Sequence, residues 1–148
     1  MRTAAALIIG NELLSGKIAD SNVVVLSRAL RSLGVVFRRV VMVLDDIDVI
    51  ADEVRTLSSS HDYLFTSGGV GPTHDDVTID AVARSFGVEV VSSPSMEQML
   101  RGYYSDRLTE GHLRMARIPD GARLASNAHM PWPAIIMRNV WVLPGVPE

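Results

Sequence analysis

Residues 67–78 read Ser67-Gly68-Gly69-Val70-Gly71-Pro72-Thr73-His74-Asp75-Asp76-Val77-Thr78. The run follows an apolar, strand-like segment and precedes a helix-like pattern. Because glycine has no Cβ, its backbone N–H groups can approach a ligand closely, and a helix start adds free N–H groups and a positive dipole end. The adjacent carboxylates of Asp75 and Asp76 would repel a phosphate unless a metal ion lay between them. The run therefore indicates a phosphate-and-metal site at the end of a strand.

Strand-like and helix-like segments alternate on both sides of this run. Apolar segments predict buried strands, and repeats of apolar residues at a spacing of 3.6 predict amphipathic helices. This alternation predicts an α/β fold of three layers, α/β/α, in which helices cover both faces of a mostly parallel sheet. We expect strands over 3–9, 35–44, 63–66 and 88–91, and helices over 21–33, 47–57, 79–86 and 94–103.

Helix ends and helix faces can be assigned in the same way. Asp46 is expected to cap the second helix, and Gly34 and Gly87 are expected to end the first and third helices. Apolar positions at helical spacing predict which side chains face the core. In the first helix these are Val23, Leu26, Leu30 and Leu33, and in the fourth helix they include Met96, Met99 and Tyr103.

The last third of the chain has a different pattern. Short strands are expected over 115–118, 134–137 and 140–143, with Arg138-Asn139 as a two-residue hairpin loop near the C-terminus. We expect one domain over 1–148. The chain ends in residues 144–148 without a closing helix, which is compatible with a piece of a longer protein.

The composition narrows the class of protein. The chain has 148 residues, 47% of them hydrophobic, a formal net charge of −3 and no cysteine. Disulfides and thiolate metal sites are therefore impossible, and there is no general basic footprint for nucleic acid. No apolar run approaches the roughly 18 residues of a membrane span, and we see no signal peptide. We expect a cytoplasmic protein that binds neither nucleic acid nor membrane.

Two loops should meet at one edge of the predicted sheet. Ligands of such folds bind outside the carboxyl ends of the strands. If the first and third strands are parallel, the loop 10–22 and the glycine-rich loop open on the same rim. The carboxylates of this rim would need a divalent cation such as Mg²⁺ to offset their repulsion. The candidates are Glu12, Asp20, Asp75 and Asp76.

Several of these residues have a structural alternative. Thr73 and Asp76 have the spacing of a helix-capping pair, and Asp75 alone could also cap. Asp20 could be the cap of the first helix. His74 is compatible with a metal ligand, although an exposed loop histidine is the commoner case. The segment 10–17 is not a P-loop, because its glycines are too far apart and Ile18 stands where Ser or Thr is required.

Four ordered blocks resemble a known family. The chain is similar to the amino-terminal domain of competence/damage-inducible CinA proteins, which belongs to the molybdopterin-binding MoaB/Mog-like superfamily. It is also similar to the corresponding domain of eukaryotic FAD synthases. The resemblance spans nearly the whole chain and rests on residues 10–16, Asp20-Ser21-Asn22, residues 68–78 and Leu143-Pro144-Gly145-Val146-Pro147-Glu148.

The resemblance implies a site that holds a phosphoanhydride by backbone amides and a divalent metal, most simply Mg²⁺, by carboxylates. It implies divalent-metal-dependent hydrolysis of a nucleotide pyrophosphate such as ADP-ribose or FAD. It is also compatible with a non-catalytic pterin or nucleotide binding module, and with molybdopterin adenylyl transfer, so molybdopterin is a possible ligand. Such relatives form dimers or trimers, so a homo-oligomer is expected.

The same resemblance assigns roles by motif. Asp75 and Asp76 are the expected catalytic residues and metal ligands, and Glu12 and Asp20 are further metal ligands. The expected contacts to phosphate or substrate are Gly10, Glu12, Ser67, Gly68, Gly69, Gly71 and Thr73, with Pro144 and Gly145 as a further wall of the pocket.

Overall fold

The computed structural model describes the chain except residues 11–20, 127, 129–131 and 145–148. The described strands form a six-stranded sheet in the order β2-β1-β3-β8-β7-β6 and a two-stranded sheet of β4 and β5. The strands are β1 Thr3–Ile9, β2 Val36–Val43, β3 Tyr63–Ser67, β4 Val90–Ser92, β5 Arg117–Pro119, β6 Arg123–Ala125, β7 Ala134–Met137 and β8 Val140–Val142. The helices are α2 Ser21–Ser32, α3 Ile47–Ser60, α4 Thr78–Phe86, α5 Pro94–Tyr104, the 3₁₀ helix η1 Ser105–Arg107, and α6 Glu110–Arg114.

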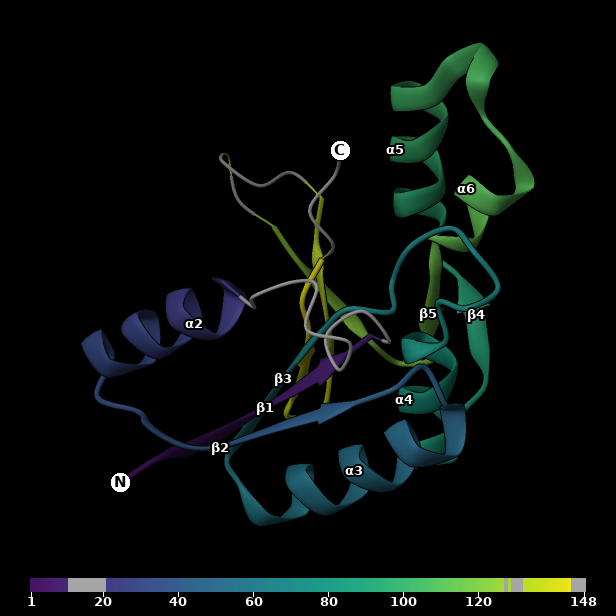
Figure 1. Cartoon of the computed structure of the whole chain (residues 1–148). Helices are drawn as coiled ribbons and strands as arrows, with labels where there is room; N and C mark the ends of the chain where they lie inside the picture. The colour runs from purple at the N-terminus through teal and green to yellow at the C-terminus, as the bar shows by residue number, and fades with distance from the viewer. Residues whose placement is uncertain (11–20, 127, 129–131, 145–148) are drawn as a thin grey trace.

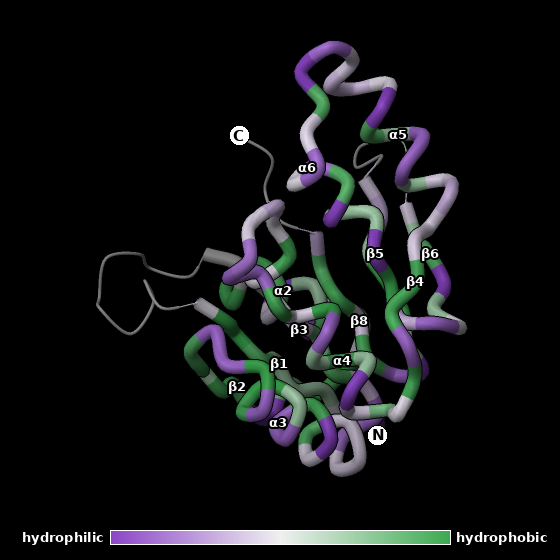
Figure 2. Tube along the Cα trace, turned by 90° about the vertical axis from the view of Figure 1, so that its right-hand side faces the viewer, coloured by the Kyte–Doolittle hydropathy of each residue, from purple (hydrophilic) through white to green (hydrophobic). Residues whose placement is uncertain are grey.

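The sheet confirms the predicted α/β class. β2, β1, β3 and β8 run parallel to their neighbours, and β7 and β6 add antiparallel strands at one edge. Figure 1 shows α2 on one side of β1 and β2, with α3 on the other side. β1 lies inside these layers, and its residues Ala4 to Ile9 are all buried. Burial on both faces explains why β1 is hydrophobic over nearly its whole length in Figure 2.

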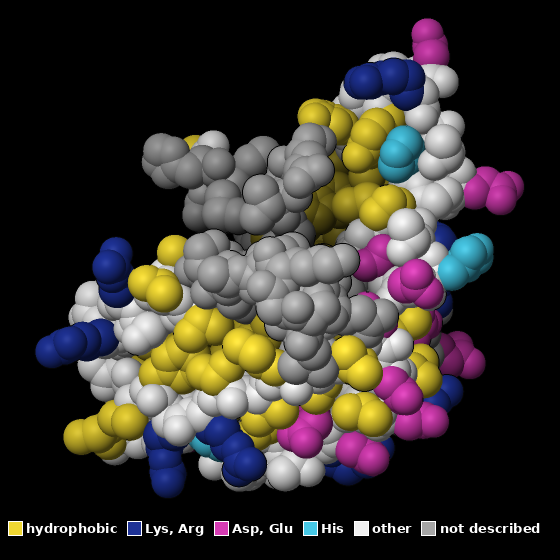
Figure 3. Space-filling view, viewed as in Figure 1, with side chains coloured by type: hydrophobic (Ala, Val, Ile, Leu, Met, Phe, Trp, Pro, Cys, Tyr) yellow, Lys and Arg dark blue, Asp and Glu magenta, His cyan; other side chains and the backbone are white. Residues whose placement is uncertain are grey.

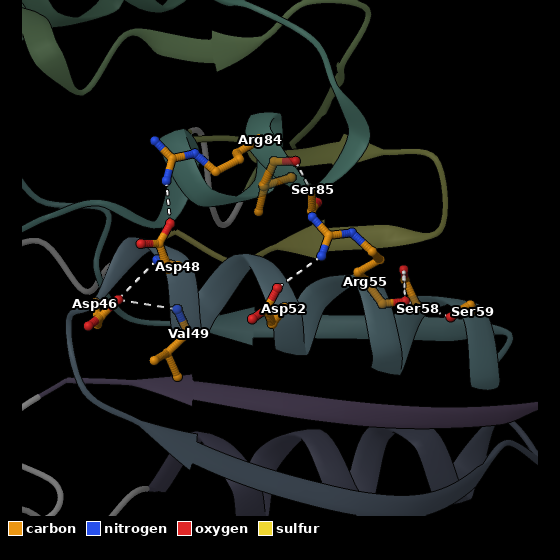
Figure 4. A network of polar contacts seen from close by, with 10 residues as sticks. Asp46, Asp48, Val49, Asp52, Arg55, Ser58, Ser59, Arg84 and Ser85 are labelled. Carbon is orange, nitrogen blue, oxygen red and sulfur yellow. Dashed lines mark hydrogen bonds and ion pairs between the residues drawn. The ribbon is translucent and has the colours of Figure 1, made fainter.

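The core lies between the sheet and the helices α3 and α4. The N-terminus of α3 is fixed by Asp46, whose Oδ1 accepts hydrogen bonds from the N–H groups of Asp48 at 3.0 Å and Val49 at 3.2 Å. This confirms the predicted cap. An ion pair between Arg84 and Asp48 links α4 to α3 (Figure 4). The side chains of α3 and α4 buried against the sheet are Ile50, Ala51, Val54, Leu57, Ala81 and Val82.

Two predictions of buried faces were wrong. Leu33, the residue after the end of α2 at Ser32, is 75% exposed. In α5 only Met96 and Leu100 are buried, whereas Met99 is 37% exposed and Tyr103 is 67% exposed. α5 stands above the β4–β5 sheet (Figures 1 and 2), so only one narrow stripe of its surface meets the core.

The short strands of the last third differ from the prediction in detail. The predicted hairpin at Arg138-Asn139 is confirmed, since β7 and β8 pair antiparallel through Met137 and Val140. Asn139 also ties this hairpin to the end of α3, because its Nδ2 donates to the carbonyl of Ser58 at 2.7 Å. The strand predicted over 88–91 is β4, which pairs with β5 outside the main sheet. β5 begins at Arg117, later than predicted, and β6 was not predicted.

Thr66 offers a test of core packing. Its side chain is fully buried in β3, and its Oγ1 has no hydrogen-bond partner among the described residues. We expect Thr66→Val to raise the free energy of unfolding by about 1 kcal/mol, because it removes an unpaired buried hydroxyl at nearly constant volume. Urea denaturation followed by circular dichroism measures this change.

Thr78→Val is the matched control. Thr78 is equally buried, but its Oγ1 donates to the carbonyl of Gly68 at 2.8 Å. We expect this substitution to lower the free energy of unfolding by about 1–3 kcal/mol, because it leaves that carbonyl without its partner. Equal effects in the two variants would contradict the assignment of an unpaired hydroxyl at Thr66.

In the described part of the chain, no helix has the length and apolar character that crossing a membrane requires.

Candidate functional site

Three segments leave the sheet at one rim. β1 and β3 are parallel neighbours, with Ile8 opposite Ser67, and β8 lies beside β3, with Val142 opposite Thr66. The carboxyl ends of these strands therefore lead into Gly10, into the glycine-rich loop and into Pro144 at the same edge. The parallel pairing of β1 and β3, on which the predicted common rim depends, is confirmed, whereas most of the loop 10–22 lies outside the described residues.

Gly68 and Gly69 are required by the packing of the chain itself. Both have positive φ angles, 98° and 70°. A Cβ on Gly68 would lie 2.0 Å from the carbonyl oxygen of Ile9, and one on Gly69 would lie 2.2 Å from Oγ1 of Thr78. Close approach of a ligand is therefore not the only reason for glycine at these positions, because the end of β1 and the start of α4 already occupy one side of them.

The capping interpretation of Thr73 and Asp76 is wrong. α4 begins at Thr78, its N-cap residue is Val77, and no side chain caps it. Asp76 instead turns back, and its Oδ2 accepts hydrogen bonds from the backbone N–H of Thr73 at 2.9 Å and from Oγ1 of Thr73 at 2.8 Å. The N–H of Asp76 donates to the carbonyl of Thr73 at 3.1 Å. These three contacts close a turn that holds the Asp76 carboxylate ahead of the helix.

The two adjacent aspartates lie in different surroundings. Asp76 is partly buried and lines a cavity beside the loop, whereas Asp75 and His74 are exposed and are not among its lining residues. Among the described residues, no group of three or more His, Asp or Glu side chains is placed to hold a metal ion. Glu12, Asp20 and Gly145 lie outside the described residues, so the four-carboxylate cluster stays a prediction.

The cavity lies between the glycine-rich loop and the segment after α6. It has a volume of about 30 Å³ and is lined in part by Gly69, Gly71, Asp76, Arg114 and Trp132. A larger hollow of about 350 Å³ adjoins it, because Trp132, Leu143 and Pro144 line both. Figure 3 shows hydrophobic side chains in the recess below α5 and α6, and acidic side chains along the rim beneath.

The hollow is the aromatic part of the site. Its wall includes Phe65 and Trp141, whose ring centroids lie 6.1 Å apart, together with Trp132. Pockets of 300–1,000 Å³ lined by apolar and aromatic side chains are typical of small-molecule sites. An aromatic wall of this kind is suited to packing against a planar heterocycle. Of the predicted contact residues, Gly69, Gly71 and Pro144 line the smaller cavity.

Sequence reasoning did not single out the two arginines of the cavity. Arg117 forms an ion pair with Asp80, with Nη2 and Oδ1 2.6 Å apart, and both side chains are partly buried. Arg114 is the last residue of α6, and its Nε is buried without a hydrogen-bond partner among the described residues. The weak signal in the sequence is their position on either side of the buried Ala116.

Comparison with known proteins agrees with this architecture. The family model described as "Probable molybdopterin binding domain" matches residues 5–148. A crystal structure of CinA, of unknown function, from Thermoplasma acidophilum is 31% identical and superposes with a TM-score of 0.87 over 98% of this chain and 90% of that one. The tungsten cofactor synthesizing protein MoaB from Pyrococcus furiosus shares the fold, with 18% identity and a TM-score of 0.58, over 98% of this chain and 82% of that one.

Two curated relatives carry informative names. A "CinA-like protein" from Desulfosudis oleivorans is 36% identical over 98% of this chain and 37% of its own length. A "Probable FAD synthase" from Caenorhabditis elegans is 33% identical over 99% of this chain and 33% of its own length. A protein from Archaeoglobus fulgidus is 34% identical over 94% of this chain and 60% of its own length. The chain thus spans between a third and three fifths of these relatives. With the family model matched from residue 5 to residue 148, the chain belongs to the molybdopterin-binding domain family, as a CinA-like member.

Proposed function

We propose that this domain binds a nucleotide pyrophosphate, such as ADP-ribose or FAD, and hydrolyses it with the help of a divalent cation. The observation that carries the proposal is the small cavity in which the glycine-rich loop and the fixed carboxylate of Asp76 meet, with an aromatic hollow that shares Trp132, Leu143 and Pro144 with it. A dinucleotide has the matching parts, namely a diphosphate and a planar base.

The donor set near the loop fits Mg²⁺. This ion retains several waters and is usually held by one or two carboxylates together with the phosphates of the substrate. Oδ2 of Asp76 is engaged by Thr73, so Oδ1 is the oxygen that remains for a cation. Asp75, and by motif Glu12 and Asp20, are the further expected ligands. A bound Mg²⁺ would supply charge neutralisation at the phosphates.

The residues of the chain have separate tasks in this proposal. N–H groups of the loop around Gly69 and Gly71 hold phosphate oxygens, and they are preorganised because Thr78 fixes the loop through the carbonyls of Gly68 and Gly69. Asp76 would hold the cation through Oδ1, the oxygen that Thr73 does not engage. Trp132, which lines both the cavity and the hollow, contacts the base.

A binding module without turnover is the second candidate. The observation in its favour is that the described residues bring only Asp76 of the acidic pair to the cavity. A domain that only binds a pterin or a nucleotide needs the loop and the aromatic wall but no metal cluster.

A panel experiment separates the two candidates. The protein is incubated with Mg²⁺ or Mn²⁺ and with ADP-ribose, FAD, NAD and ATP, and the products are identified by mass spectrometry. We expect AMP to be released from ADP-ribose or FAD, and the release to stop when EDTA is added. Binding in calorimetry without any product would favour the binding module, and neither binding nor product across the panel would contradict both.

A further inference from the structure

Arg114 lies on an element that packs directly against the glycine-rich loop. α6 is held by a capping box in which Thr109 Oγ1 accepts from the N–H of His112 and the His112 ring nitrogen accepts from the N–H of Thr109. The His112 ring also stacks on Tyr104, with centroids 3.7 Å apart and planes 6° apart. A Cβ on Gly111 would lie 3.1 Å from the carbonyl oxygen of Pro72, so α6 and the loop are in close contact. The position of Arg114 relative to the loop is therefore well fixed.

Among the described residues of the cavity wall, Arg114 is the arginine without a carboxylate partner. Arg117 lines the same cavity, but Asp80 accepts from both of its terminal nitrogens, at 2.6 and 3.5 Å. Among the described residues, no carboxylate lies within ion-pair distance of Arg114. Asp76, the other acid of the cavity wall besides Asp80, is engaged by Thr73. Arg114 thus lines the cavity without a carboxylate partner from this part of the chain.

The buried Nε makes this arrangement costly unless an anion binds there. A buried N–H donor without a partner costs about 1–3 kcal/mol, and more when the group is charged. A guanidinium presents its N–H groups in a planar fork that matches two oxygens of a phosphate, which a lysine ammonium does not. The loop with its N–H groups and Arg114 both line one small cavity, so a phosphate placed there would receive donors from both.

We propose that Arg114 binds a phosphate group in the cavity, as the side-chain partner of the glycine-rich loop. The inference rests on the proposed function only in that the ligand carries phosphate. It assigns Arg114 to ligand binding and Arg117 to fixing the wall through Asp80. It also predicts that the two arginines respond differently to substitution.

The test uses inorganic pyrophosphate, AMP and adenosine as probes, with binding followed by calorimetry and by tryptophan fluorescence in the presence and absence of Mg²⁺. We expect Arg114→Met, which keeps the aliphatic stem, to weaken pyrophosphate binding at least about tenfold and to leave adenosine binding unchanged. Arg114→Lys should restore part of the affinity. The control is Arg107→Met, an exposed arginine in η1 that does not line the cavity, which should bind all three probes like the parent protein.

Thermal unfolding provides a second readout. Because Arg114→Met removes an unpaired buried donor, we expect its melting temperature without ligand to be equal to or above that of the parent, whereas a structural role would lower it. Pyrophosphate should raise the melting temperature of the parent and not that of Arg114→Met. If Arg114→Met does not fold, the pyrophosphate affinity of Arg114→Lys tests the inference instead. Loss of the bidentate fork alone should weaken pyrophosphate binding several-fold.

The outcomes distinguish this inference from the proposed function. Unchanged pyrophosphate affinity in Arg114→Met overturns the inference, and so does a parent protein that does not bind pyrophosphate under either condition. If pyrophosphate binding is lost in Arg114→Met while no nucleotide of the panel is hydrolysed, the proposed hydrolysis fails and the role of Arg114 stands.

Discussion

Gly68→Ala is expected to lower the free energy of unfolding by about 3–5 kcal/mol, a large part of the 5–15 kcal/mol that typically holds a domain together. Two effects add. Gly68 has a φ of 98°, a conformation that L-residues rarely adopt, and its Cβ would lie 2.0 Å from the carbonyl oxygen of Ile9. That oxygen belongs to the backbone at the end of β1, so relief requires that the loop or the strand end move. Urea denaturation monitored by tryptophan fluorescence measures the loss.

Gly121→Ala separates the two effects. Gly121 has a φ of 90°, close to that of Gly68, but nothing lies within 4 Å of the position that a Cβ would take there. Gly121→Ala should therefore lower the free energy of unfolding by about 1–2 kcal/mol, from the unfavourable backbone conformation alone. Equal losses in the two variants would contradict the close approach between the loop and β1. A much larger loss at Gly68 would show that this glycine is required by packing even when no ligand is present.

The large elements of the fold could be predicted because their signals are local. The apolar run of β1, the cap at Asp46 and the αL glycine Gly87 after α4 each depend on a few neighbouring residues. β5 begins two residues later than predicted, and β6 was not predicted. Which strands pair is not a local property. The sequence therefore could not place β4 outside the main sheet.

The candidate site was predictable only in part, for the same reason. The shared rim followed from parallel strands, but the spacing of Thr73 and Asp76 suits both a helix cap and a closed turn. Because α4 begins at Thr78 and has no side-chain cap, Thr73 and Asp76 form the closed turn and not the helix cap. Arg114 shows a further limit, because an arginine facing a cavity looks like any surface arginine in a sequence. Its role depends on α6 packing against Pro72, a contact between residues distant in the chain.

Asp76→Asn is expected to reduce metal-dependent hydrolysis of the best panel substrate by about 100-fold or more, with a much smaller effect on folding. The amide keeps the size of the side chain and one oxygen that can accept from Thr73. It removes the negative charge that would hold a cation and orient water. The loss should therefore appear in kcat/KM and in the dependence of rate on Mg²⁺ concentration, with a free energy of unfolding lower by about 1–2 kcal/mol.

Two neighbours test whether this effect is specific to the position of Asp76. Asp75→Asn changes the same chemical group at an exposed position outside the cavity wall, so we expect a smaller loss of rate if Asp76 is the principal ligand. Thr73→Val removes the hydroxyl that donates to Oδ2 at 2.8 Å but leaves the carboxylate in place. It should lower the rate roughly 10–100-fold, as loss of a group that orients a metal ligand typically does.

The pattern across the three variants decides between chemistry and structure. If Asp76→Asn and Thr73→Val lower stability equally and leave kcat/KM and the Mg²⁺ dependence unchanged, the turn between Thr73 and Asp76 serves only the fold. If instead excess Mg²⁺ partly restores the activity of Thr73→Val and does not restore that of Asp76→Asn, Thr73 positions the carboxylate and Asp76 supplies the charge. Because both contacts of Oδ2 come from one residue, the geometry of this turn predicts the second pattern.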